Sequence, residues 1–136
     1  MTDRKPVKVS KTDAEWRQQL SPEAFNVARK HATERPFSHP YNDEKGGGSY
    51  RCICCDAPLF DSTAKFDSGT GWPSFFAPAS PDAVVELEDN GMFRRRTEIR
   101  CARCDAHLGH VFADGPAPTG QRYCMNGVAL KFIPEG

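Results

Sequence analysis

One short pattern occurs twice in this chain and restricts how the chain can fold. The sequence Arg-Cys-x-x-Cys-Asp-Ala-x-Leu begins at Arg51 and again at Arg100. In each copy two thiols three residues apart can point at one ion, and two such pairs complete the tetrahedral site that zinc prefers. Cys54 aligns with Arg103 and therefore stands outside the pattern. The expected zinc ligands are Cys52, Cys55, Cys101 and Cys104.

The same four cysteines could instead form two disulfides. That alternative needs an oxidising compartment, and the N-terminal residues contain no apolar segment typical of a secretory signal. We therefore expect a structural zinc site in a cytoplasmic protein whose remaining thiols stay reduced. The two pairs lie much further apart than the about 15–20 residues of an ordinary zinc ribbon, so the intervening chain must form a structure of its own.

Length and composition indicate one small domain without a strong overall electrostatic field. The chain has 136 residues, of which 38% are hydrophobic, and we expect residues 1–136 to form a single domain with residues 1–11 as a loose arm. A bound metal would add stability that so thin a core lacks. The 18 basic and 18 acidic residues balance, so we expect no binding to nucleic acid, and no segment is apolar enough for a membrane.

Local signals predict short helices followed by strands. A capping box opens a helix over residues 12–20, and a Ser-Pro start signal opens a second over residues 21–32. From Ser49 onward, short alternating runs between turn residues indicate β-strands. We therefore predict a mainly β fold of two small twisted antiparallel sheets, with the helices packed against them from the N-terminal side.

The gap between the cysteine pairs contains a predicted hairpin. Asp89-Asn90-Gly91 lies between the runs 83–88 and 92–100, and Asp-Asn-Gly is a strong hairpin signal. A zinc ion would clamp this hairpin at its base. The run Arg94-Arg95-Arg96 alternates between the two faces of a strand, so it predicts a solvated hairpin rather than a phosphate-binding patch.

A second turn signal lies near the C-terminus. Asn126-Gly127 separates the runs 122–125 and 128–133, which could form another hairpin. Alternate residues of the last run share one face and are expected in the core. These residues are Val128, Leu130 and Phe132.

Of the two cysteines outside the zinc set, Cys124 is the better candidate for a nucleophile. A thiol reacts as its thiolate, which cationic and hydrogen-bonding neighbours such as Arg122 favour. His107 and His110, upstream of Cys124, suggest proton donors rather than additional metal ligands, because four cysteines already complete a closed zinc site. A buried structural cysteine is the alternative for Cys124.

Three further residues have both a functional and a structural interpretation. Asp114 could orient a histidine or mark an Asp-Gly turn, and Asn126 could belong to the site or to its Asn-Gly turn. Trp72 follows two glycines and precedes a proline, so it lies on a bent segment. An indole there either anchors the loop or forms one wall of an apolar pocket.

Taken together, these stretches resemble the methionine-R-sulfoxide reductases of the B type. The resemblance covers nearly the whole chain in the family's order, and its most specific parts are Gly-Trp-Pro-Ser-Phe and Arg-Tyr-Cys-x-Asn. It implies the two-sheet β-tent fold with a structural zinc clamp. The matching motifs are Thr33-Glu-Arg-Pro-Phe37, both cysteine pairs, the stretch 65–75, the stretch 107–115 and the stretch 122–127.

The resemblance implies a role for each candidate residue. Cys124 would attack the sulfoxide sulfur of methionine-R-sulfoxide in peptides or proteins, and the resulting sulfenic acid would be reduced by thioredoxin or another thiol. The other roles would fall as follows: His107 and His110 hydrogen-bond and protonate the sulfoxide oxygen, Asn126 positions the site, Arg122 favours the thiolate, Asp114 supports a histidine, and Trp72 and Phe112 bind the substrate.

This chain departs from the family pattern at one place. Many members carry a resolving cysteine where this chain has Thr70, and no cysteine precedes Cys52. The sulfenic acid at Cys124 would then be resolved either by Cys54, after a local shift, or directly by an external thiol. We favour the external thiol, because sulfenic acids condense readily with accessible thiols.

Two other functions compete with the reductase interpretation. A zinc-ribbon module could bind RNA or protein, with a steep salt dependence for RNA, but the balanced charge argues against it. A Cys-His hydrolase could use Cys124 with one histidine, but such an enzyme needs an oxyanion hole and normally a single base. A His-x-x-His pair with a tryptophan wall suits a sulfoxide better, because its oxygen must be protonated before its sulfur is attacked.

Overall fold

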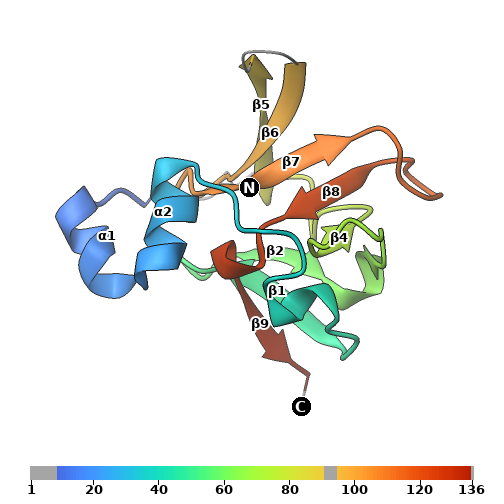
Figure 1. The fold of residues 1–136 in the computed structure, drawn as a ribbon, viewed down its shortest axis with the longest axis horizontal. Coiled ribbons are helices and arrows are strands. Elements are labelled where there is room, and N and C mark those ends of the chain that lie inside the picture. The colour runs from blue at the N-terminus through green and yellow to red at the C-terminus, as the bar shows by residue number, and fades with distance from the viewer. Residues whose placement is uncertain (1–8, 91–94, 136) are drawn as a thin grey trace, which may run out of the picture.

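The computed structural model describes residues 9–90 and 95–135, in which two antiparallel sheets follow two helices (Figure 1). The smaller sheet has the strand order β2-β1-β9, and the larger has the order β3-β4-β8-β7-β6-β5. The predicted mainly β fold is confirmed. The strands are β1 (Gly48–Cys52), β2 (Pro58–Asp61), β3 (Lys65–Phe66), β4 (Ser74–Phe75), β5 (Val84–Asn90), β6 (Arg95–Cys101), β7 (His107–Phe112), β8 (Arg122–Met125) and β9 (Leu130–Pro134).

Both predicted helices are present. Helix α1 (Asp13–Gln19) begins at Thr12, whose hydroxyl accepts a hydrogen bond from the Glu15 N–H while the Glu15 carboxylate accepts one from the Thr12 N–H. Helix α2 (Pro22–Lys30) begins after Ser21, whose hydroxyl caps it. The two helices lie together beside the sheets (Figure 1). Short 3-10 helices also occur: η1 (Pro40–Asn42), η2 (Ser62–Ala64) and η3 (Gly127–Ala129).

Strands β5 and β6 form the predicted hairpin, which projects from the rest of the molecule (Figure 1). Their pairing runs from Val84 opposite Cys101 to Asn90 opposite Arg95. The first two residues of the predicted turn therefore belong to β5, and the connection lies in residues 91–94, outside the part of the chain that the structure describes. Cys101 lies at the base of the hairpin, as the expected clamp requires.

The second predicted hairpin is wrong. Strands β8 and β9 belong to different sheets, and η3, which includes Val128, lies between them. Instead of forming a turn, the Asn126 side chain accepts a hydrogen bond from the Glu34 N–H and donates one to the Leu108 carbonyl. These long-range bonds hold the chain where it crosses from the larger sheet to the smaller one, and no local signal could reveal them.

Aromatic side chains join the two sheets. Tyr50 from β1, Phe60 from β2 and Phe75 from β4 are completely buried. The Phe75 ring lies 5.1 Å from the Tyr50 ring and 4.5 Å from the Phe60 ring, measured between centroids. Leu130 is buried and Phe132 packs against the same core, as predicted for the last strand. Because β4 contributes Phe75 from the larger sheet, the core fixes the positions of the sheets relative to each other.

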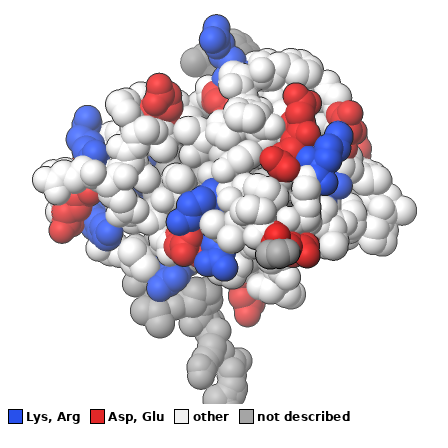
Figure 2. Space-filling view, turned by 90° about the horizontal axis from the view of Figure 1, so that it is seen from below, with Lys and Arg blue, Asp and Glu red and all other residues white. Residues whose placement is uncertain are grey.

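Surface charge is mixed on the face shown in Figure 2, where acidic and basic side chains are interspersed. Across the described residues, no helix is both long and apolar enough to cross a bilayer.

Candidate active site and metal centre

Four cysteines come together where β1 and β6 end. Their Sγ atoms all lie within 4.8 Å of one another, and the pairs Cys52–Cys104 and Cys55–Cys101 are each separated by 3.6 Å. Sulfur ligands about 2.3 Å from a tetrahedral zinc lie roughly 3.8 Å apart, so the cluster has the size of a zinc site. None of the six cysteines is in a disulfide, so the structure does not support the disulfide alternative.

The two cysteine pairs have the same local geometry. The residue after each second cysteine, Asp56 or Asp105, has a left-handed φ of 66° or 62°. Its N–H donates a hydrogen bond of 2.9 Å to the carbonyl of the first cysteine. Another backbone N–H in each pair donates to the first cysteine's sulfur, at 3.4 Å in both cases. Such donors favour thiolates, the form in which cysteine binds metal.

The N-terminal helices cover the metal centre. Arg29 of α2 donates to the Cys104 carbonyl at 3.1 Å, and its guanidinium lies over the buried Trp16 ring, 4.5 Å from the centroid. Gln19 of α1 donates to the Cys54 carbonyl at 2.6 Å. The four cysteines fit a structural zinc ion, because four thiolates leave no coordination position for a substrate.

A separate cavity of about 430 Å³ opens beside β7 and β8. It gathers most of the residues expected in the active site from distant parts of the chain. Those that line it are Trp72, His110, Phe112, Asp114, Arg122, Cys124 and Asn126. His107 and Cys54 are the two expected site residues that do not line it.

Pairing between β7 and β8 determines which side chains meet in the cavity. His110 lies directly opposite Cys124, and Phe112 lies opposite Arg122. Directly opposed residues on neighbouring strands point to the same face of the sheet. Gly109 keeps the strands at pairing distance, because a side chain at this position would collide with the Cys124 carbonyl oxygen.

The Cys124 thiol is partly buried, and this affects its ionisation. Burial raises the pKa of Cys124 above its usual value, whereas the hydroxyls of Thr70 and Ser74 and the Arg122 guanidinium oppose the rise. Thr70 Oγ1 lies 3.9 Å from the Cys124 sulfur. Arg122 therefore favours the thiolate but does not outweigh burial. In the free protein Cys124 is protonated at neutral pH.

Asp114 pairs with Arg122 rather than with a histidine. Arg122 donates to both Asp114 oxygens, at 2.8 and 3.1 Å. A guanidinium presents two parallel N–H groups that match a carboxylate, so this bidentate pair is stronger than a single histidine bond. The Arg122 guanidinium also lies over the Phe112 ring, 4.4 Å from its centroid. Asp114 thus holds Arg122 between the aromatic wall and Cys124, and the expectation that it supports a histidine is corrected.

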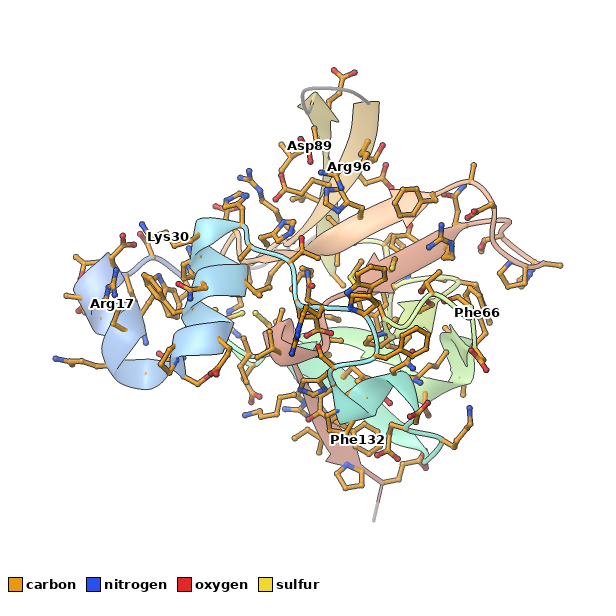
Figure 3. The ribbon with its side chains drawn as sticks, in the orientation of Figure 1. Arg17, Lys30, Phe66, Asp89, Arg96 and Phe132 are labelled. Atoms are coloured by element: carbon orange, nitrogen blue, oxygen red, sulfur yellow. The ribbon has the colours of Figure 1, made fainter. Side chains whose placement is uncertain are left out.

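The partner of His110 is Asp89 on the projecting hairpin. His110 Nε2 lies 3.0 Å from Asp89 Oδ2, and Arg96 donates to the same oxygen at 3.2 Å. Figure 3 shows Asp89 and Arg96 side by side on β5 and β6. Arg96 also lines the cavity, so it is not the freely solvated charge predicted for the arginine run, and Arg94 lies outside the described residues. Sequence analysis missed Asp89 because its Asp-Asn-Gly context indicated a turn.

His107 lies behind His110 instead of in the cavity. It is 3% exposed, and its ring centroid is 5.5 Å from that of His110. Its Nδ1 lies 2.7 Å from a Glu98 oxygen, which leaves Nε2 buried without a hydrogen-bond partner among the described residues. Burial lowers the pKa of His107, and Glu98 opposes this effect. The ring is therefore neutral at neutral pH.

Glu98 is a second acidic residue that sequence analysis missed. Arg100 donates to both of its oxygens, at 2.9 and 3.1 Å. A second group of potential metal ligands also lies here, with its ligand atoms within 4.8 Å of one another: Glu98, His107 and His31. The Arg100 cation already occupies the carboxylate, however, so this group does not fit a metal ion. The inward position of Glu98 could be recognised only once the register of β6 against β7 was known.

Glu34 ties several parts of the cavity together. Its N–H donates to Asn126 Oδ1 and its carbonyl accepts from Trp72 Nε1, both at 3.0 Å. Its carboxylate accepts the first two N–H groups of η3, at 2.8 and 3.0 Å. Trp72 is therefore both an anchor for its loop and a wall of the cavity. The motif over residues 33–37 was the only sequence signal for this role.

Cys54 packs beside the metal centre without being one of its four ligands. It is 6% exposed, follows Cys52 within the first cysteine pair, and is held by the bond from Gln19 to its carbonyl. The cavity that contains Cys124 is lined by other residues. A reaction between the two thiols would thus require Cys54 to leave its packed position.

A zinc-supported β fold with one cysteine in a cavity, opposite a histidine and beside a tryptophan, defines a thiol-dependent enzyme. The SelR domain family matches residues 20–134, and the chain belongs to this family, the B-type methionine sulfoxide reductases.

Three curated relatives illustrate the similarity. "Peptide methionine sulfoxide reductase MsrB" of Pseudomonas fluorescens (strain Pf0-1) is 60% identical over 94% of this chain and 98% of its own length. The protein of the same name from Pseudomonas putida (strain W619) is 59% identical over 94% of this chain and 96% of its own. That of Agrobacterium fabrum (strain C58) is 55% identical over 98% of this chain and 99% of its own.

Replacing one zinc ligand should unfold the protein, whereas replacing its free neighbour should not. Structural zinc contributes about 10 kcal/mol or more in small zinc domains, comparable with the total stability of roughly 5–15 kcal/mol for a typical domain. C101S should therefore lose zinc and its cooperative melting transition. C54S, which alters the same cluster without removing a ligand, should keep both. Zinc content and thermal melting would measure this, and a C101S protein that melts like the wild type but is inactive would contradict a structural role.

The raised pKa of Cys124 predicts how its alkylation depends on pH. Because only the thiolate reacts, the rate with iodoacetamide should rise with pH and level off at a higher pH than for an ordinary cysteine. T70V removes a hydroxyl that favours the thiolate, so its rate at neutral pH should be lower than that of T70S, which retains the hydroxyl. Peptide mass spectrometry of Cys124 would report the rates. Equal rates in the two variants would exclude a role for the Thr70 hydroxyl.

Proposed function

We propose that this protein reduces methionine-R-sulfoxide in peptides or proteins, with Cys124 as the attacking thiol. One observation carries this proposal: Cys124 stands apart from the four-cysteine cluster, in a cavity where His110 faces it and Trp72 forms a wall. The relatives named peptide methionine sulfoxide reductase support it, since they match almost the full chain at 55–60% identity. A hydrolase or a zinc-ribbon binding module has no comparable support.

The reaction requires a nucleophile at the sulfur and a proton donor at the oxygen of the sulfoxide S–O bond. The Cys124 thiolate attacks the sulfoxide sulfur while the oxygen is protonated. The S–O bond of the substrate breaks, and the oxygen is transferred to Cys124 as a sulfenic acid with release of methionine. Cys124 is thereby oxidised by two electrons and methionine sulfoxide is reduced by two. Two external thiols then restore Cys124 and release water and a disulfide.

His110 is placed to protonate the oxygen. Its position opposite Cys124 puts both side chains on one face, and Asp89 fixes the orientation of its ring. His107, which lies behind His110 and is held by Glu98, supports that ring and does not contact the substrate. Asn126 lines the cavity and uses one amide hydrogen on the Leu108 carbonyl, so a second hydrogen is available for the sulfoxide oxygen.

Trp72 and Phe112 provide the apolar contacts that distinguish the substrate's methyl group from its oxygen. Both line the cavity with Cys124, and each is held in place by a partner: Glu34 binds the indole N–H, and the Arg122 guanidinium covers the Phe112 ring. An apolar wall for the methyl group and a polar wall for the oxygen accept only one sulfoxide configuration. This agrees with the use of one enzyme for each sulfoxide epimer.

We further propose that an external thiol, thioredoxin or another, restores Cys124, and that the protein acts in the cytoplasm. The absence of any disulfide among the six cysteines is consistent with a reducing compartment. Thr70 stands beside Cys124, where a resolving cysteine would be within reach, and Cys54 is packed in the metal centre. The balanced charge of 18 basic and 18 acidic residues supports the absence of a nucleic-acid partner.

The activity itself predicts a selective loss of one epimer. Racemic N-acetylmethionine sulfoxide incubated with the protein and dithiothreitol should lose the R epimer alone. C124S should be inactive although it folds normally, and C54S should remain active because dithiothreitol resolves the sulfenic acid. Chiral chromatography would follow both epimers. Consumption of both epimers, or activity in C124S, would refute the proposal.

The position of Thr70 predicts that a resolving cysteine can be restored by one substitution. With one equivalent of substrate and no reductant, wild type and C54S should each lose one thiol and form a dimedone adduct at Cys124. T70C should lose two thiols and form no adduct, because its new thiol lies near the sulfenic acid. If wild type loses two thiols and C54S only one, then Cys54 is the resolving residue.

A further inference from the structure

Among the large hydrophobic side chains of the described residues, that of Phe37 is the most exposed. It is 69% exposed, whereas Val85, Leu87 and Ile133 are 36–39% exposed. Its φ of 63° is left-handed, a conformation that is strained for a bulky residue. Phe37 therefore combines a strained backbone with an aromatic ring that is largely exposed to water, and both are energetically unfavourable. Strained residues of this kind often occur where a ligand is held.

One face of the Phe37 ring has a clear structural role. The Phe37 N–H donates to the Gly71 carbonyl at 2.7 Å, and a side chain added at Gly71 would lie 2.7 Å from the Phe37 ring. The ring therefore lies directly on the Gly71 backbone, and Gly71 is buried beneath it. This contact accounts for one face of the ring. The exposed area of Phe37 shows that the rest remains uncovered.

Phe37 packs on Gly71, whose two neighbours in sequence line the cavity that contains Cys124. Gly71 lies between Thr70 and Trp72, which both line that cavity, and Thr70 Oγ1 is 3.9 Å from the Cys124 sulfur. Neighbouring Cα atoms are about 3.8 Å apart, and an extended peptide advances about 3.3–3.6 Å per residue. Only Thr70 and Gly71 stand between the Cys124 sulfur and the Phe37 ring along this path, which corresponds to a span of about one to three residues of an extended peptide.

We propose that Phe37 determines specificity for the residues that flank methionine sulfoxide in a polypeptide substrate. An apolar side chain next to the oxidised methionine packs on the uncovered face of the ring, which extends the apolar wall of Trp72 beyond the cavity. This inference rests on the proposed function and goes beyond it, because it concerns the sequence around the sulfoxide. The occupant is the substrate chain itself, since the ring packs on Gly71, between two residues that line the cavity where that chain must enter.

The contact has a defined energetic consequence. Covering an aromatic face with an apolar side chain removes apolar surface from water in the bound state alone, so it strengthens binding without changing the chemistry at Cys124. Its loss should raise KM for a substrate with apolar flanks and leave kcat unchanged. Free methionine sulfoxide derivatives have no flanking side chains and should not respond.

The experiment compares three substrates of the R configuration: N-acetylmethionine sulfoxide, a pentapeptide with leucines flanking methionine sulfoxide, and the same peptide with serines. Wild type should prefer the leucine peptide. F37A should lose this preference through a rise in KM of about tenfold for the leucine peptide, with its rate on N-acetylmethionine sulfoxide unchanged. F37W should retain the preference. I133A, which removes another exposed apolar side chain on β9, should behave as wild type.

Two results would overturn the proposal. If F37A weakens activity on all three substrates equally, the ring serves only to position the loop around Gly71. If F37A keeps the wild-type preference for leucine, Phe37 does not contact the substrate. Failure of the proposed function is distinguishable from both, because wild type would then be inactive on N-acetylmethionine sulfoxide as well.

Discussion

The attraction of four thiolates to one ion is the constraint on which the rest of this structure depends. Cys52 ends β1 of the smaller sheet, and Cys101 ends β6 of the larger sheet. The metal centre therefore joins the sheets at one place, and the aromatic core of Tyr50, Phe60 and Phe75 joins them at another. Only 38% of the residues are hydrophobic, so the core alone would join the two sheets weakly. The metal ion adds the free energy of folding that this core lacks.

With the sheets fixed, the reactive residues are positioned by strand register. His110 faces Cys124 because β7 and β8 pair in one register, and a slip by one residue would turn Cys124 to the other face of the sheet. The hairpin β5–β6 contributes Asp89 as the partner of His110, and the segment around Glu34 holds Trp72 and Asn126. The metal and the nucleophile thus use separate sets of cysteines and are linked through the sheets and through α2, whose Arg29 binds the Cys104 carbonyl.

The parts that could be predicted from sequence were those with local signals. The doubled cysteine pattern indicated the ligand set because each pair is complete within a few residues, and the capping residues indicated both helices. The hairpin expected at Asn126-Gly127 was wrong, since the bonds from Asn126 to Glu34 and Leu108 are invisible without the fold. Asp89 and Glu98 were missed for the same reason, because a carboxylate becomes a partner for a histidine only through strand pairing.

The pairing of β1 with β9 has a consequence for how the protein is made. Gly48–Cys52 pairs with residues at the end of the chain, and Glu34 binds η3 more than ninety residues away in sequence. The bonds by which Glu34 holds this side of the cavity cannot form until Asn126 and η3 have left the ribosome. Contacts of such long sequence separation also slow folding. The newly synthesised chain therefore organises its reactive thiol only after η3, more than ninety residues beyond Glu34, has been made.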